Sequence, residues 1–353
     1  MRRRVLLASL IAMPFAIGRA AERTNFKDPL ELPARRTPLA ATGELMAVAS
    51  VGDRLIAVGP QGHILASVDR GASWQQVDCP VSCDLVAVQF PTSEVGWAVG
   101  HDGVVLRSAD AGRTWSKHLD GRQLNALMVA KYEKLEKDGD PQGPAIMKDV
   151  RQFASEGPAK PLLDVWFLNE REGFLIGAFN LIFKTEDAGK TWEPWYERTE
   201  NPQRFHLNAM RGNGDDLYVV GEQGLVLRLD RAQQRFVALT SPYAGSLFGL
   251  AASGQTVIVC GLRGNALRST DAGRTWSHVL KASGSTFTAA TSLPDGRVVM
   301  VDLSGRVLVG DGASGEFKTL DLQRRGRIFG VTAVNKNALA LAGDGGIKIV
   351  PLV

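Results

Sequence analysis

The chain has 353 residues, of which 44% are apolar and 22% are charged, as in an ordinary globular protein. The first twenty residues contain four arginines and no acid, and the remaining residues carry equal numbers of basic and acidic side chains. A polyanion-binding function, including nucleic-acid binding, is therefore not indicated. Glycine supplies 38 residues, above its usual share of about 7%, which indicates many tight turns.

The N-terminus has the pattern of an export signal. Arg2, Arg3 and Arg4 precede an apolar stretch at 5–17, and Gly18 and Ala20 provide small residues before a cleavage site. The stretch is too short to cross a bilayer, which takes about 20 residues. We expect a signal peptide at 1–20 that follows the general secretory route. The mature chain, 21–353, would then be periplasmic and without a transmembrane anchor.

A repeated turn organises the rest of the sequence. Its form is G-x-x-G or a close variant between two apolar runs, as expected for a hairpin, because glycine and asparagine tolerate a positive φ. Successive turns start 41, 77, 44, 40, 41 and 41 residues apart. A unit of about 41 residues repeated seven times predicts an all-β, seven-bladed β-propeller. The turns are 59–62, 100–103, 177–180, 221–224, 261–264, 302–305 and 343–346.

One apolar run per unit aligns as the innermost strand of a blade, and the seventh unit ends after its third strand. We expect the missing strand to come from the stretch around Leu30 to Leu39, closing the ring. Its prolines, Pro29, Pro33 and Pro38, suit an edge strand, where a missing N–H is tolerated. The innermost runs are 45–48, 85–88, 163–166, 207–210, 247–250, 287–290 and 328–331.

Two cysteines, Cys79 and Cys83, flank a short predicted loop. In an oxidising compartment they could form a disulfide, and no further ligands stand near them for a zinc site. Cys260 ends an apolar run and is predicted to be a buried thiol. The histidines show no metal-ligand spacing, so we expect neither a metal nor a cofactor.

The spacing of 77 implies an insertion, at about 119–161, between blades two and three. Apolar residues recur at helical spacing over 122–137 and again over 145–156, with a glycine- and proline-rich break between them. This predicts a helical hairpin lying on the propeller. It either covers the blades or binds a partner.

Four units carry a second motif, S/T-x-D-x-G-x-S/T-W, known as the Asp box. Its Asp and Ser/Thr side chains can bond to loop backbone, its Gly permits the bend, and its Trp can pack between blades. These residues are therefore interpreted as structural. They are Asp69, Gly71 and Trp74; Asp110, Gly112 and Trp115; Asp187, Gly189 and Trp192; and Asp271, Gly273 and Trp276.

The boxes resemble the Asp-box (BNR) repeats of sialidases and related propellers. With seven units and an export signal, residues 40–350 are most similar to the photosystem II stability and assembly factor family. That resemblance implies a non-catalytic propeller that assists assembly of a membrane-protein complex from the lumenal or periplasmic side. It implies an envelope or membrane-protein partner. We expect the chain to be monomeric.

The alternative is a secreted carbohydrate-active enzyme of the sialidase type. A sialidase needs an arginine triad, a tyrosine nucleophile beside a carboxylate, and an acid, and its Phe/Tyr-Arg-Ile-Pro signature is absent here. No tyrosine has an acidic partner at a recognisable spacing. A glycosidase with two carboxylates would use Asp102 and Glu222, which lie two blades apart. We therefore predict no catalytic residue.

Propellers usually bind partners where loops converge around the channel. The G-x-x-G turns and the connections that enter the innermost strands should share one face, and an exposed Phe179 among polar residues would suit an interface anchor. The predicted partner-binding residues are Gln61, His101, Asp102, Phe179, Arg204, Glu222, Gln223, Arg263, Arg325 and Arg327.

Overall fold

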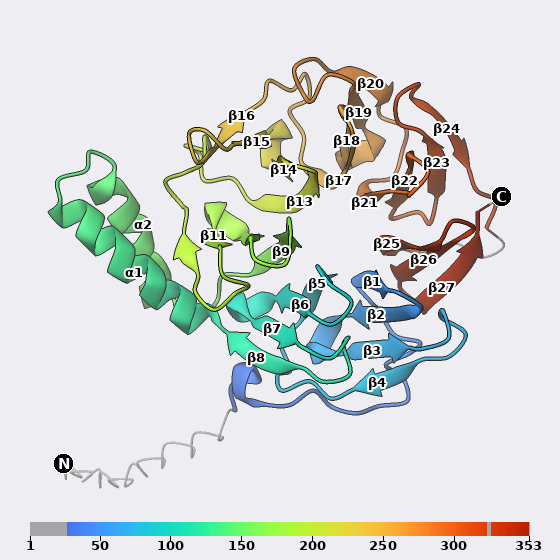
Figure 1. Ribbon diagram of the computed structural model, residues 1–353, viewed down its shortest axis with the longest axis horizontal. Coiled ribbons are helices and arrows are strands. Elements are labelled where there is room, and N and C mark those ends of the chain that lie inside the picture. Colours follow the sequence, from blue (N-terminus) through green and yellow to red (C-terminus); the bar gives the residue numbers. More distant parts are fainter. Residues whose placement is uncertain (1–26, 323–325, 353) are drawn as a thin grey trace, which may run out of the picture.

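A computed structural model describes residues 27–322 and 326–352. Seven antiparallel sheets stand around a central channel, and each sheet is one blade (Figure 1). The predicted seven-bladed propeller is therefore confirmed. The expected signal peptide and Arg325 lie outside the described residues. Neither helix of the described part is long and apolar enough to cross a membrane.

The first three blades follow the chain in order. Blade 1 consists of β1 (Ala47–Val51), β2 (Arg54–Val58), β3 (Ile64–Ser67) and β4 (Gln75–Val77). Blade 2 consists of β5 (Leu85–Gln89), β6 (Gly96–Gly100), β7 (Val105–Ser108) and β8 (Ser116–Leu119). Blade 3 consists of β9 (Leu162–Phe167), β10 (Gly173–Gly177), β11 (Ile182–Thr185) and β12 (Glu193–Pro194).

The remaining blades repeat this plan until the last. Blade 4 consists of β13 (Leu207–Asn213), β14 (Asp216–Gly221), β15 (Val226–Asp230) and β16 (Arg235–Ala238). Blade 5 consists of β17 (Leu247–Ser253), β18 (Thr256–Gly261), β19 (Ala266–Ser269) and β20 (Ser277–Leu280). Blade 6 consists of β21 (Phe287–Ser292), β22 (Arg297–Asp302), β23 (Val307–Asp311) and β24 (Glu316–Thr319). Blade 7 has β25 (Ile328–Asn335), β26 (Ala338–Gly343) and β27 (Gly346–Pro351).

The hydrophobic core is divided among the interfaces between blades. Each of seven apolar clusters joins two neighbouring blades, and one of them also includes the insertion. The second strands are the most deeply buried; in β6 and β10 every residue is buried. Burial on both faces explains why these strands read as continuous apolar runs.

Each Asp box is a closed network of hydrogen bonds in the turn between the third and fourth strands. In blade 1, Asp69 accepts bonds from the Ser73 N–H (2.9 Å), the Ser73 hydroxyl (2.5 Å) and the Ser67 hydroxyl (2.7 Å). The Gly71 N–H donates to the Ser67 hydroxyl at 2.7 Å. The bonds from Ser73, with that from Ser67, lower the pKa of Asp69 to about 2. The same bonds recur at Asp110, Asp187 and Asp271.

The box glycines also allow neighbouring blades to pack closely. A Cβ built on Gly189 of blade 3 would lie 2.3 Å from the Trp97 ring of blade 2, and one on Gly112 of blade 2 would lie 2.7 Å from Ile56 of blade 1. Gly71 of blade 1 stands in the same way against Ile349 of blade 7. The structural interpretation of the boxes therefore fits their position: each packs its turn on the preceding blade.

The prediction that the stretch around Leu30 to Leu39 completes blade 7 is wrong. Within the described residues, blade 7 has three strands, and residues 27–43 form an extended strap that begins with η1 (Pro29–Glu31) and runs along blades 2 and 1. The Ala34 N–H donates to the Cys79 carbonyl at 3.0 Å, and the Gln76 side chain bonds to the backbone of Arg35 and Thr37. These bonds to β4 and to the connection that follows it hold the strap along blade 1 rather than along β27.

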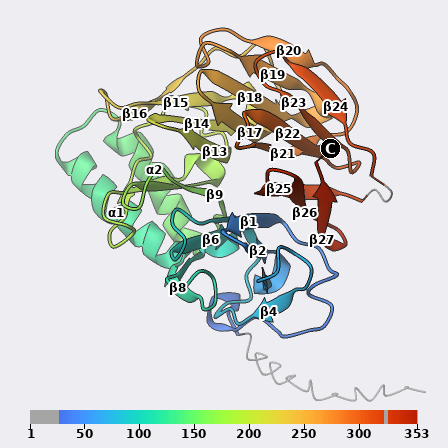
Figure 2. The same cartoon turned by 45° about the vertical axis from the view of Figure 1, so that its right-hand side comes forward.

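Two helices occupy the predicted insertion, α1 (Gly121–Lys137) and α2 (Gly143–Ser155). They pack against each other and stand outside the ring beside blade 3, as Figures 1 and 2 both show. Asp120 caps α1 with its carboxylate, which accepts the Arg122 N–H at 3.0 Å. Apolar residues of both helices join the cluster between blades 2 and 3: Leu124, Met128, Tyr132, Ile146, Met147, Val150 and Phe153.

Candidate functional site

The predicted partner-binding residues lie on one face of the ring, here called the turn face. It consists of the turns that join the second and third strands of each blade and the connections that lead into the next blade. Gly62, Gly224 and Gly264 of these turns each stand directly against such a connection. Five of the turns are short 3-10 segments: η2 (Pro60–Gly62), η3 (His101–Gly103), η4 (Ala178–Asn180), η5 (Glu222–Gly224) and η6 (Leu262–Gly264).

The positive φ expected of the glycine, or of Asn180, occurs at the last position of each of these 3-10 turns, and the residue before it also has a positive φ. Phe179 has φ 54° and Asp102 has φ 55°. Phe179 in this position is 41% exposed. The other residues in this position are Gln61, Gln223 and Arg263.

The structure brings three of the predicted residues together near the insertion, in what we call the Phe179 cluster. The Phe179 ring lies 4.7 Å from the His206 ring, whose Nδ1 is 2.6 Å from the Glu222 carboxylate. Burial would raise the pKa of Glu222, but hydrogen bonds from the backbone and ring of His206 hold it below its usual range. Arg204 lies beside this group, with its guanidinium 4.4 Å from the centre of the Tyr196 ring.

The insertion supplies the remaining members of the cluster, Phe153 and Lys160. The Phe153 and Phe179 rings are 6.2 Å apart, and the Lys160 ammonium lies 5.1 Å from the centre of the Phe179 ring. Sequence reasoning missed Phe153 and Lys160 because they stand in the insertion, and it did not select His206. Arg204 was predicted on this face because it lies just before an innermost strand. The same reasoning applies to His206.

The other predicted residues are spread around the ring. Gln61, His101 and Asp102 stand on blades 1 and 2, and Arg263 stands on blade 5. Arg327, at the entry to blade 7, is engaged in ion pairs with Asp344 (2.9 Å) and Glu44 (3.3 Å). These residues do not form one site with Phe179.

Two tyrosines fasten the insertion to the connection between blades 3 and 4. The Tyr132 hydroxyl donates to Glu197 at 2.5 Å and accepts the Tyr196 N–H at 2.9 Å. The Tyr196 hydroxyl in turn donates to Asp149 of α2 at 3.0 Å. Both rings are fully buried. Buried side chains therefore attach the insertion to the propeller beside the Phe179 cluster.

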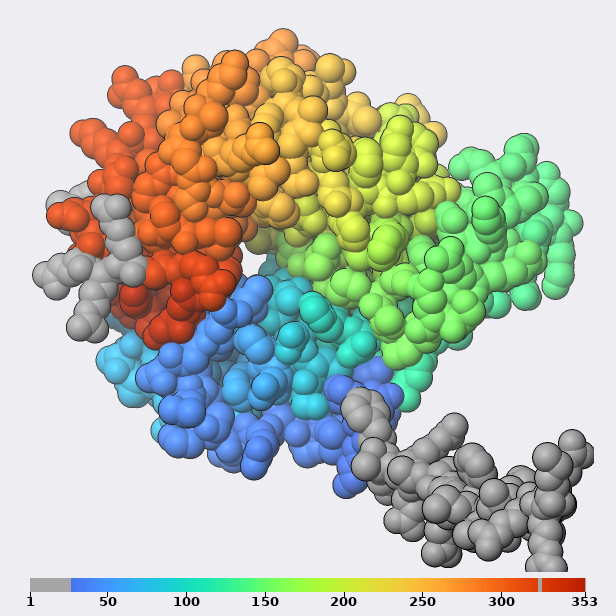
Figure 3. Space-filling model, turned by 180° about the vertical axis from the view of Figure 1, so that it is seen from behind, coloured from blue at the N-terminus to red at the C-terminus, as the bar shows by residue number. Residues whose placement is uncertain are grey.

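The channel is narrow and nearly neutral. The innermost strands line a cavity of about 130 Å³, and the ring is hollowed at its centre in Figure 3. One ion pair stands in its wall, with Arg211 Nη1 2.5 Å from Asp164 Oδ2. The Asp164 carboxylate also accepts the N–H groups of Met210 and Val165, so its bonding capacity is largely used by the protein itself.

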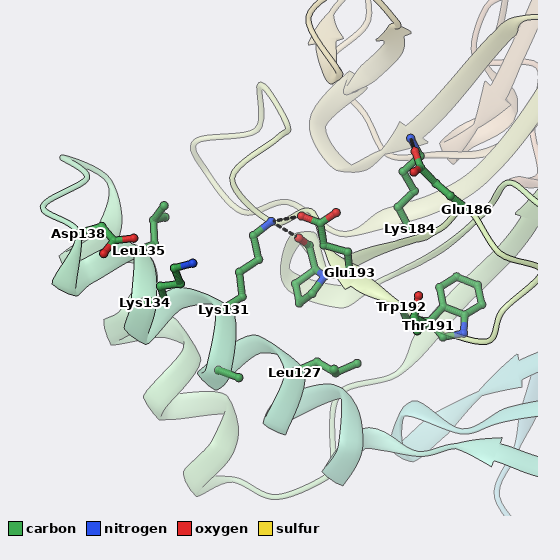
Figure 4. Close-up of a pocket in the computed structure, with 12 residues that line it drawn as sticks. Leu127, Lys131, Lys134, Leu135, Asp138, Lys184, Glu186, Thr191, Trp192 and Glu193 are labelled. Carbon is green, nitrogen blue, oxygen red and sulfur yellow. Dashed lines mark hydrogen bonds and ion pairs between the residues drawn. The ribbon is translucent and has the colours of Figure 1, made fainter.

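A larger groove, of about 680 Å³, separates α1 from the outer edge of blade 3 (Figure 4). Trp192 and Leu127 contribute apolar surface. Lys131 reaches across it to Glu193 (3.0 Å) and to the carbonyl oxygen of Pro194 (2.5 Å). Its charged lining is balanced, with three lysines and three acids, so it shows no preference for one sign of charge: Lys131, Lys134, Lys184, Asp138, Glu186 and Glu193.

Sequence reasoning missed the acidic partners of the tyrosines. A tyrosine beside a carboxylate is what a sialidase-type nucleophile requires, and Tyr132 and Tyr196 each have one. Both are buried against the insertion, and desolvation is the main reason that their pKa values are raised. These contacts join the insertion to the connection between blades 3 and 4.

The described residues contain no cluster of three or more His, Cys, Asp or Glu side chains placed to hold a metal ion. Cys79 and Cys83 are buried free thiols within one apolar cluster under the strap. Burial raises the pKa of Cys79 to about 11. The disulfide between them stays a prediction.

Comparison with known proteins supports the relationship that the repeats suggested. Residues 152–310 match the family model described as photosynthesis system II assembly factor YCF48. The photosystem II assembly protein Ycf48 of Synechococcus sp. (strain JA-2-3B'a(2-13)) is 27% identical over 167 residues, covering 44% of this chain and 49% of the relative. The photosystem II assembly lipoprotein Ycf48 of Synechococcus sp. (strain RCC307) is 41% identical over 54 residues, covering 15% and 16%. The chain thus spans half or less of the length of these curated relatives.

Solved structures agree at the level of the fold. "YCF48 bound to D1 peptide" superposes with a TM-score of 0.63 at 14% identity, covering 91% of this chain and 99% of that one. "YCF48 from Cyanidioschyzon merolae" gives a TM-score of 0.62 at 14% identity, covering 89% and 97%. The chain is therefore a seven-bladed β-propeller that is similar, over residues 152–310, to the photosynthesis system II assembly factor YCF48 family.

Proposed function

We propose that this chain is a non-catalytic assembly factor that acts after export, in a periplasmic or lumenal compartment, and binds a segment of a membrane-protein client. The named relatives are assembly proteins, and one solved relative is described as bound to a D1 peptide. The proposal carries that kind of role over to this propeller, with the client left open. Export rests on the pattern of the first twenty residues.

The observation that carries the proposal is the Phe179 cluster. Phe179 presents 41% of its surface to solvent, and side chains from the insertion and from the connection into blade 4 lie around it. A large, partly exposed aromatic ring held by its neighbours is typical of a binding hot spot. The cation of Lys160 and the carboxylate of Glu222 beside the ring would orient a polar client segment around an apolar anchor.

The test compares two substitutions in structurally equivalent turns. Phe179→Ala removes the anchor, and Arg263→Ala makes the matched change two blades away, where the residue has nearly the same φ of 56°. The purified chain is immobilised and exposed to detergent-solubilised membranes of its source organism, and each retained protein is quantified by mass spectrometry. We expect Phe179→Ala to reduce retention of the principal client at least tenfold, which corresponds to about 1.4 kcal/mol, and Arg263→Ala to leave it unchanged.

Melting curves of both variants serve as the control for folding. Equal losses in the two variants, or a client retained undiminished by Phe179→Ala, would contradict the assignment of the site. Cleavage of glycans by the wild-type chain would instead support the carbohydrate-active alternative.

A further inference from the structure

Blade 7 has an open outer edge. Within the described residues, every other blade carries a fourth strand on its third, whereas β27 pairs with β26 alone. We propose that the free edge of β27 binds an extended segment of a partner protein, which pairs with it as the fourth strand of the blade. This interaction lies beyond the client site proposed above, since β27 and the insertion stand on opposite sides of the ring (Figure 1).

The backbone of β27 offers hydrogen-bonding groups to such a strand. The Leu352 N–H donates to the Asn337 carbonyl at 2.7 Å, and the antiparallel register continues inward from that pair. Hydrogen-bonded pairs alternate along an antiparallel ladder, so Lys348 and Val350 direct their N–H and C=O groups toward β26. Ile347 and Ile349 direct theirs outward. Four backbone groups are thus arranged for a partner strand.

The side chains of β27 indicate what that strand should carry. Ile349 is 38% exposed and packs on Gly71 of the neighbouring box, and Ile347 packs against the cluster between blades 7 and 1. Lys348 projects from the opposite face of the strand and is exposed. A partner strand with an acidic residue opposite Lys348 and apolar residues on either side would complement both faces. The expected core is therefore apolar–acidic–apolar.

A second copy of this chain fits the edge poorly. In a symmetric antiparallel pair centred on Lys348, the two lysines would face each other, and like charges in that position are destabilising. In a symmetric pair centred on Ile349 instead, Pro351 of one copy would lie opposite Ile347 of the other. Pro351 has no N–H to donate to the ladder. Lysine and proline on an edge strand are devices that discourage self-pairing. The charge of Lys348 thus selects a different, acidic strand.

The test uses the full chain and two capped ten-residue peptides that differ only at the centre, Val-Glu-Val and Val-Lys-Val. Residue-resolved amide exchange is measured by NMR at Ile347 and Ile349, with peptide added up to millimolar concentration. In the free chain we expect both amides to exchange rapidly. The glutamate peptide should slow them at least tenfold and bind several-fold more tightly than the lysine peptide.

A charge exchange provides the matched control. Lys348→Glu should reverse the preference between the peptides, whereas Lys318→Glu, the same change on the exposed fourth strand of blade 6, should leave it unaltered. Slow exchange of Ile347 and Ile349 in the free chain would overturn the proposal, since the edge would already be covered by the chain itself or by a second copy. So would the absence of protection by either peptide, or a preference that Lys348→Glu does not change. Whether Phe179→Ala retains its client has no bearing on this peptide test, so the two proposals can fail independently.

Discussion

At the scale of single residues, the Asp boxes combine turn chemistry with packing between blades. Gly189 needs both properties of glycine: its φ is +80°, and a Cβ would lie 2.3 Å from the buried Trp97 ring. Gly214, in an exposed hairpin turn, has φ +60° with nothing within 4 Å of a Cβ. A side chain added at Gly214 therefore meets backbone strain alone, whereas one added at Gly189 meets both backbone strain and steric overlap.

We expect Gly189→Ala to lower the free energy of unfolding by about 2–4 kcal/mol and Gly214→Ala by about 1 kcal/mol. The first value contains the cost of the left-handed conformation plus displacement of Trp97, and the second contains the conformational cost alone. Equilibrium urea denaturation of the two variants measures the difference. Equal losses would show that the box does not hold the two blades together.

At the scale of elements, the insertion is fastened to the propeller by side chains rather than by its covalent ends alone. Tyr132 is the central contact, because its hydroxyl both donates to Glu197 and accepts the buried Tyr196 N–H. The cation of Lys131 adds an ion pair to the same Glu197 at 2.7 Å. This arrangement keeps α1 and α2 in place beside the Phe179 cluster.

Tyr132→Phe should lower the free energy of unfolding by about 1–3 kcal/mol, because it leaves the Tyr196 N–H without its acceptor. Tyr218→Phe is the control: that ring is also fully buried, but its hydroxyl makes a long bond of 3.4 Å to the Ala272 carbonyl. We expect the control to cost less than about 1 kcal/mol. Thermal unfolding of both variants, followed by near-ultraviolet circular dichroism, compares the two losses of stability. A larger loss in Tyr218→Phe than in Tyr132→Phe would contradict the prediction.

At the scale of the whole molecule, blades 7 and 1 pack against each other and the strap lies across them, and in residues 27–322 and 326–352 no N-terminal strand joins blade 7. The strap begins beside blade 2, where Leu30 is buried with Cys79 and Val81, and it reaches blade 7, where a Cβ built on Gly346 would lie 2.1 Å from the Ala41 carbonyl oxygen. It therefore ties three consecutive blades across the seam, and within the described residues no strand pairs with the outer edge of β27.

Leu30→Ala should cost about 2–4 kcal/mol of unfolding free energy, because it opens a cavity under the strap. Leu39, on the same strap, is 70% exposed, and Leu39→Ala should cost less than about 0.5 kcal/mol. Chemical denaturation compares the two. A negligible effect at Leu30 would mean that the start of the strap contributes little to stability.

The sequence alone was sufficient for the number of blades, their repeated turns and the two helices of the insertion, but not for the closure of the ring. Hairpin turns, Asp boxes and amphipathic helices depend on residues within a few positions of one another, so Gly100, Asp110 and the apolar positions of 122–137 could be interpreted without a structure. The same local reasoning placed Phe179 and Arg204 on one face, because strands in a blade alternate in direction.

Only the tertiary structure decided where distant segments meet. The strap followed blade 1 rather than β27 because Gln76 and Cys79 offer partners for its backbone. Tyr196 and Asp149 are 47 residues apart, and Phe153 reaches Phe179 only because the insertion folds back on blade 3. Such contacts depend on the path of the chain through space, which local patterns do not encode. The seven blades thus followed from the sequence, whereas the Phe179 cluster and the open edge of β27 emerged from the packing.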